Sequence, residues 1–94
     1  MEGLIRLDVS ELEPPEPLVR VMAALQSLPA RHCLQMVHRM KPCLLYDNIG
    51  PLNIVADTRE GKDGRCEVYL WHKGDSEGER IVRAMADPLP PWKE

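Results

Sequence analysis

Hydrophobic and polar positions alternate with the period of a β-strand in four segments of the chain. The first, Leu4–Val9, points Ile5, Leu7 and Val9 to one side and charged residues to the other, which is typical of a half-buried strand. The second, His32–His38, is apolar on both sides and is therefore expected inside a sheet. The remaining two segments, Leu52–Thr58 and Arg65–His72, are joined by a predicted hairpin loop at Glu60–Gly64.

Between these segments the apolar positions take the period of an α-helix. One helix is predicted from Pro17 to about Leu28, because proline suits the first turn of a helix and Pro29 ends it. Its buried face consists of residues three or four apart: Leu18, Val21, Met22, Leu25 and Leu28. A second, short helix is predicted to begin at Pro42 and to end at Asn48 and Gly50, which adopt left-handed conformations at low cost.

The order of these elements predicts an α+β fold. It is a two-layer β-α-β-α-β-β sandwich, with a four-stranded mixed sheet and both helices on one face. Residues 1–73 are expected to form this domain. Residues 74–94 are expected to form a C-terminal tail that is either partly disordered or packed on the domain, with a turn or two of helix around Glu79–Met85.

One sheet face carries Tyr69 and Trp71 and lies opposite the two predicted helices. A two-layer fold leaves such a face open unless the tail or a second copy of the chain covers it. A homodimer through this face is therefore one expectation, beside coverage by the tail.

Composition narrows the classes of function. The 94 residues are 44% hydrophobic and 29% charged, which fits one globular domain. A net charge of −3 and a content of two Trp, two Tyr and no Phe argue against nucleic-acid binding. The longest stretch without charge or histidine, Val21–Ala30, is far shorter than the ~20 residues of a membrane span. Three cysteines without CxxC spacing or a secretory signal predict reduced thiols in the cytoplasm.

The turn after the second predicted strand collects the candidate binding residues. Residues 17–46 contain four basic residues and no acidic one, although the whole chain is acidic. A cluster of positive charge at the start of a helix can attract a small anion or an acidic protein partner. The predicted site consists of His38, Arg39, Lys41, Pro42 and Cys43.

Cys43 is the candidate reactive thiol. The start of a helix and the basic residues beside it both favour the thiolate. The alternative is that Cys43 is a small apolar residue in the first helical turn, as free cysteines often are. Cys33 and Cys66 occupy strand positions and are expected to pack in the core.

A metal or haem site is a further alternative for the same turn. Met36, His38, Met40 and Cys43 offer thioether, imidazole and thiolate ligands, which suit copper(I) or haem iron. The candidate ligands are His38, Met40 and Cys43, whereas Met36 alternates with Leu34 as a core residue would. Their spacing matches no zinc template, and no cofactor is otherwise expected.

Several segments match the pattern of a known superfamily: Leu7–Val9, Leu12–Leu18, Leu25, Leu28–Pro29, Val37–Arg39, Pro42, Leu44–Leu45, Gly50 and Val68–Trp71. Over roughly residues 4–72 the chain resembles the TusA-like (SirA-like) domains. It is most similar to an uncharacterised branch of that superfamily, a domain of unknown function that occurs alone or beside hemerythrin-type domains in bacteria. The resemblance implies the same sandwich fold.

The chain departs from this pattern at one position. Sulfur carriers of the superfamily have Cys-Pro-x-Pro at the start of the first helix, and the cysteine holds a persulfide. Here the corresponding stretch is Pro14-Pro15-Glu16-Pro17, with proline at the cysteine position. Because proline has no nucleophile, the resemblance does not carry the sulfur-carrier chemistry to this position.

The pattern of residues favours binding over catalysis. No paired carboxylates, Ser/His/Asp set or phosphate-binding glycine loop predicts an ordinary enzyme. The interpretation is a non-catalytic binding or adaptor module with its recognition turn at His38–Cys43. The alternatives are a sulfur-handling or redox protein that uses Cys43, and the metal or haem site.

Overall fold

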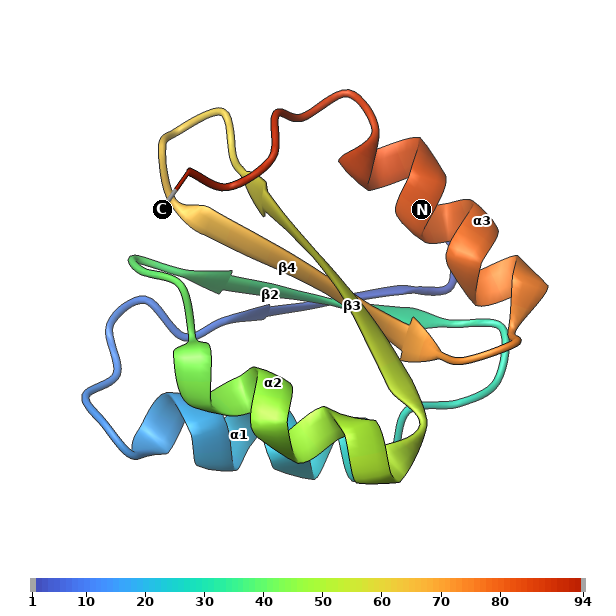
Figure 1. Ribbon diagram of the computed structural model, residues 1–94, viewed down its shortest axis with the longest axis horizontal. Helices are drawn as coiled ribbons and strands as arrows, with labels where there is room; N and C mark the ends of the chain where they lie inside the picture. Colours follow the sequence, from blue (N-terminus) through green and yellow to red (C-terminus); the bar gives the residue numbers. More distant parts are fainter. Residues whose placement is uncertain (1, 94) are drawn as a thin grey trace.

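The computed structural model describes residues 2–93, and its centre is a four-stranded sheet (Figure 1). The strands are β1 (Leu4–Asp8), β2 (Cys33–His38), β3 (Ile54–Glu60) and β4 (Cys66–His72), in the order β1-β2-β4-β3. The helices are α1 (Glu16–Gln26), α2 (Cys43–Ile49) and α3 (Ser76–Ala86), and a 3₁₀ turn, η1 (Gly50–Leu52), follows α2. β1 pairs with β2 in parallel and the other two pairs are antiparallel, so the predicted α+β fold with a mixed sheet is confirmed.

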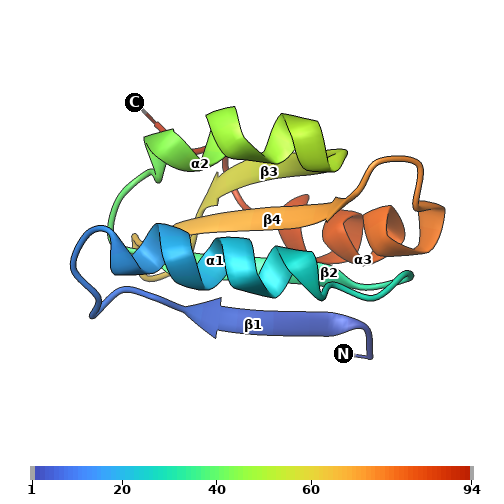
Figure 2. The ribbon, with the colours of Figure 1, turned by 90° about the horizontal axis from the view of Figure 1, so that it is seen from below.

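The apolar sides of α1 and α2 pack on the same face of the sheet, as predicted (Figure 2). Val21 and Leu25 of α1 and Leu45 of α2 are buried with Met36 and Val68 of the two central strands. Each fully buried aliphatic side chain of this kind stabilises the fold by about 1.5–3 kcal/mol. All six residues of β2 are buried, which confirms its expected place inside the sheet.

The first strand shows how position in the sheet modifies the alternation. Leu7 and Val9 contribute to the core on the side of α1, as the pattern predicts. Ile5 belongs to the same side but remains 39% exposed, because β1 is an edge strand with a neighbour on one side only.

The connection from α2 to β3 differs from the prediction. Gly50 is helical, with φ −54°, and the left-handed residue is Asn53, with φ 57°. Pro51 explains the difference, because its fixed φ is compatible with another helical turn and extends the helix into η1. β3 therefore begins at Ile54 and not at Leu52.

Residues 76–86 form a helix that covers the other face of the sheet. The carboxylate of Asp75 caps α3 by accepting a hydrogen bond from the N–H of Gly78 at 3.1 Å. The residues buried between α3 and the sheet are Ile81, Val82, Ala86, Cys33, Tyr69 and Trp71. The sheet face at Tyr69 and Trp71 is therefore covered by α3, which belongs to the segment 74–94, and both side chains are buried.

The chain after α3 returns along the outer edge of β3. The N–H of Glu60 donates to the carbonyl of Pro90 at 2.9 Å, and the N–H of Trp92 donates to the carbonyl of Thr58 at 3.3 Å. This segment pairs backbone groups that an edge strand would otherwise expose. Within residues 2–93, no helix has the length and apolar character needed to cross a membrane.

Candidate functional site

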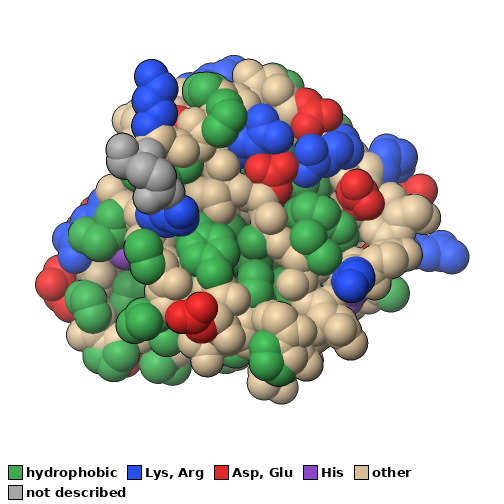
Figure 3. All heavy atoms as spheres, in the orientation of Figure 1, with side chains coloured by type: hydrophobic (Ala, Val, Ile, Leu, Met, Phe, Trp, Pro, Cys, Tyr) green, Lys and Arg blue, Asp and Glu red, His purple; other side chains and the backbone are tan. Residues whose placement is uncertain are grey.

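A cavity of about 380 Å³ opens between the starts of α1 and α2. Its walls come from the proline run at α1, the end of β2, the turn that follows it and the first residues of α2: Pro14, Pro15, Pro17, Leu18, Val21, Met36, His38, Met40, Lys41, Pro42, Cys43, Leu44 and Leu45. No aspartate or glutamate is among these lining residues. On the face seen in Figure 3, hydrophobic side chains gather over and beside α2, whereas charged ones concentrate around α3.

His38 is the one lining residue with a buried imidazole. Its side chain lies at the end of β2, the residue is 6% exposed, and its Nδ1 has no hydrogen-bond partner within residues 2–93. Burial lowers the pKa of His38 and the charge of Arg39 lowers it further, whereas the Val9 backbone and Asp8 act in the opposite direction. The lowered pKa favours the neutral form of the ring.

The rim of the cavity is apolar and accessible. Met40 is 54% exposed and Leu44 is 69% exposed, two of the four large hydrophobic residues that are exposed within residues 2–93. Cys43, the first residue of α2, is also exposed. The ammonium group of Lys41 lies 5.5 Å from the centre of the Tyr46 ring, which orients the lysine along α2.

The start of α2 offers little to a small anion. The N–H of Cys43 already donates to the carbonyl of Lys41 at 3.0 Å, and the N–H of Leu45 donates to that of Pro42 at 2.9 Å. Arg39 points to another partner, since its guanidinium forms an ion pair with Glu13 at 2.8 Å. These contacts favour an apolar ligand over a phosphate or sulfate.

The other two cysteines lie in the core. Cys33 and Cys66 are fully buried, and burial raises the pKa of each thiol to about 11. A thiol with so high a pKa carries almost no thiolate at pH 7 and is a poor nucleophile. Cys43 is therefore the accessible thiol of the described chain.

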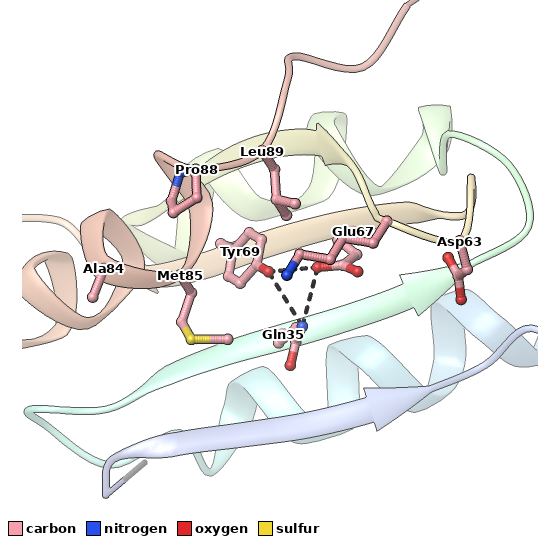
Figure 4. A pocket seen from close by; sticks show the side chains of 9 residues that line it. Gln35, Asp63, Glu67, Tyr69, Ala84, Met85, Pro88 and Leu89 are labelled. Carbon is pink, nitrogen blue, oxygen red and sulfur yellow. Dashed lines mark hydrogen bonds between the residues drawn. The ribbon is translucent and has the colours of Figure 1, made fainter.

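A second cavity, of about 420 Å³, lies on the α3 side of the sheet (Figure 4). At its floor the hydroxyl of Tyr69 donates to Oε1 of Glu67 at 2.5 Å, and the amide of Gln35 donates to the same oxygen at 3.2 Å. Burial raises the pKa of Tyr69, and the carboxylate of Glu67 raises it further. The polar groups of this floor satisfy one another, whereas Nδ1 of His38 in the first cavity has no partner. We therefore take the first cavity as the candidate site.

The cavity brings together most of the residues that the sequence singled out. His38, Met40, Lys41, Pro42 and Cys43 line it, and Arg39 does not. Within residues 2–93, no group of three or more His, Cys, Asp or Glu residues could hold a metal ion.

Sequence reasoning missed the wall that the proline run at α1 contributes, Pro14, Pro15 and Pro17. The available signal was the position of Pro14, which corresponds to the persulfide cysteine in the resemblance described above. That position lies in the same cavity as Cys43, from the other helix.

The comparison with protein families gives one match. Residues 6–72 match the family model described as an uncharacterized conserved protein, DUF2249. The chain belongs to the DUF2249 family. No curated protein and no solved structure shows significant similarity to the chain. The matched DUF2249 region contains the whole cavity, from Pro14 to Leu45, but ends before α3.

Proposed function

We propose that this DUF2249 chain is a non-catalytic binding module that docks an acidic protein segment bearing an apolar side chain. The observation that carries the proposal is the apolar cavity with Met40 and Leu44 exposed at its rim. Apolar side chains that fill well-packed pockets contribute most of the binding energy at protein interfaces. Exposed methionine adapts its shape to a partner and is common on such surfaces.

Charge supports an acidic partner. Lys41 lines the cavity, and no aspartate or glutamate does. Arg39 and Arg20 already form ion pairs with Glu13 and Glu16, so the charge at the cavity comes from Lys41. A positive charge at a binding site raises the association rate of a negatively charged segment and disfavours a positive one.

Selection of peptides on the intact chain tests this function. A library of random twelve-residue peptides is displayed on phage, and the selected peptides are measured by fluorescence anisotropy. We expect acidic peptides with an apolar anchor, and at least a tenfold loss of affinity for Leu44→Asp, because this substitution places a charge at the rim of the cavity. Val19→Asp is the matched control, since Val19 is an exposed apolar helix residue (54%) that does not line the cavity.

The proposal is wrong if the selected peptides bind Leu44→Asp as tightly as they bind the original chain. It is also wrong if Val19→Asp weakens binding equally, because the loss would then report surface charge and not the cavity.

We further propose that the DUF2249 family is a branch of the TusA-like superfamily, found in bacteria alone or beside hemerythrin-type domains, and that the protein is cytoplasmic. The order of elements and the start of α1 at a proline run support the first statement. The three unpaired cysteines support the second.

Sulfur handling through Cys43 is the second candidate function. Its support is the exposure of Cys43 in the same cavity as Pro14, the position at which the related sulfur carriers have their cysteine. Cys43→Ser separates the two functions, because a binding module keeps its selected peptides and a sulfur carrier loses its capacity to hold a persulfide.

A further inference from the structure

Four of the residues that line this cavity carry a soft donor atom. Met36 and Met40 contribute thioether sulfurs, Cys43 a thiol and His38 an imidazole nitrogen. Thiolate and thioether ligands select copper(I), whereas hard cations require the oxygen ligands that the lining residues lack. We infer that the cavity binds one copper(I) ion through His38, Met40 and Cys43, with Met36 at its inner wall. The inference rests on the proposed binding role of this cavity and names a second ligand for it.

The environment of His38 is the independent observation. Its Nδ1 is buried without a hydrogen-bond partner, which costs stability unless something satisfies it. His38 also lines the cavity, from the end of β2. A metal ion at Nδ1 satisfies this buried nitrogen.

The donors divide into an inner and an outer pair. Met36 and His38 are buried, whereas Met40 and Cys43 are exposed at the rim. An ion therefore enters from solvent past the outer pair and meets the inner pair at the end of β2. Cys43 binds as thiolate, so its proton is released to solvent when copper(I) binds.

Two other features restrict the choice of ion and of ligands. Zinc sites rely on cysteine, histidine and carboxylate, and thioethers are poor ligands for zinc, so replacing methionine sulfur discriminates between the two metals. Cys33 and Cys66 do not line the cavity, and their thiols are fully buried. They are therefore not expected to compete for the ion.

The experiment is an anaerobic competition between the full chain and the chelator bicinchoninate for copper(I) supplied as its acetonitrile complex. We expect one copper(I) per chain to be withdrawn from the chelator. Met40→Leu and Cys43→Ser should each weaken binding at least tenfold, and both positions are exposed, so the variants should fold. Met85→Leu is the matched control, because Met85 packs on the α3 side of the sheet. Zinc(II), measured against a zinc chelator, should bind at least tenfold more weakly than copper(I).

Three results would overturn the inference. They are no withdrawal of copper(I), equal retention of zinc(II), and a loss confined to Cys43→Ser with Met40→Leu unchanged, which would indicate an adventitious thiol. Failure here is distinguishable from failure of the proposed function. Met40→Leu keeps the apolar rim and should still bind the selected peptides, whereas Leu44→Asp should lose the peptides and keep copper(I).

Discussion

Asp57 connects α3 and the C-terminal segment to the sheet. Its carboxylate accepts hydrogen bonds from Nε of Arg59 at 2.7 Å, from Nη2 of Arg59 at 3.1 Å and from Nη2 of Arg83 at 2.5 Å. Arg59 also donates to the carbonyl of Leu89 at 2.8 Å, and Arg83 belongs to α3. Asp57→Asn removes the charge that holds both guanidinium groups in place, so α3 and the segment after it lose a common anchor.

The expected cost follows from the burial of this network. The side chains of Asp57 and Arg59 are each 18% exposed, and that of Arg83 is 38% exposed. Removing one partner of a fully buried ion pair costs about 3–5 kcal/mol, and partial exposure to water lowers this to about 2 kcal/mol. For a domain of this size, about 2 kcal/mol corresponds to a decrease in Tm of roughly 8–16 °C.

The pH dependence provides a second measurement. Hydrogen bonds from Arg59, aided by those from Arg83, lower the pKa of Asp57 below its ordinary value of 3.8 despite burial of the carboxyl. A lowered pKa in the folded state means that the stabilisation is present above pH ~3.8 and is lost as the pH falls through the folded pKa. The difference in stability between Asp57→Asn and the original chain should therefore be full at pH 7 and smaller at pH 2.

Urea unfolding followed by circular dichroism at pH 7 and pH 2 measures both quantities. Asp47→Asn is the control, because Asp47 is exposed on α2 and should change stability by less than about 0.5 kcal/mol. An effect of Asp57→Asn below about 0.5 kcal/mol at pH 7 would refute the anchoring role. An effect of the same size at both pH values would refute its electrostatic cause.

Two further predictions concern other polar contacts. Hydrogen bonds from Ser10, and then the hydrogen bond and charge of Arg65, lower the pKa of Asp8 to about 2. An NMR titration of the Asp8 carboxyl carbon should therefore have its midpoint near pH 2, and a midpoint near pH 3.8 would contradict this prediction. Gly61→Ala should destabilise the fold by about 1–3 kcal/mol, because its new Cβ meets Oε2 of Glu67, whose other oxygen accepts the Tyr69 hydroxyl. This cost should decrease in a Glu67→Ala background, and an equal cost in both backgrounds would show that the glycine is needed for another reason.

The comparison of α2 and α3 shows where local patterns are sufficient. α2 begins where Pro42 and the apolar spacing predict it. The helical conformation then continues beyond Ile49 into η1, because Pro51 is compatible with a further helical turn. α3 has local signals of its own, the capping Asp75 and the acidic first turn. Those signals indicate that a helix can form, but whether it is stable depends on burying Ile81 and Val82 against the sheet, which is a contact with residues far away in the chain.

In the candidate site, too, some features follow from local sequence and others only from packing. The sequence by itself identified the turn from His38 to Cys43, because residue types and charge along a short segment can be read locally. It also determined which strand and helix faces are apolar, since these depend on a period of two or 3.6 residues. Packing alone decided that Pro14 and Pro15 of the α1 region form the opposite wall of the cavity and that His38 is left with a buried, unpartnered nitrogen. A periodic pattern states which side of an element avoids water, whereas the element that covers that side, and the space left between the two, follow only from how the whole chain packs.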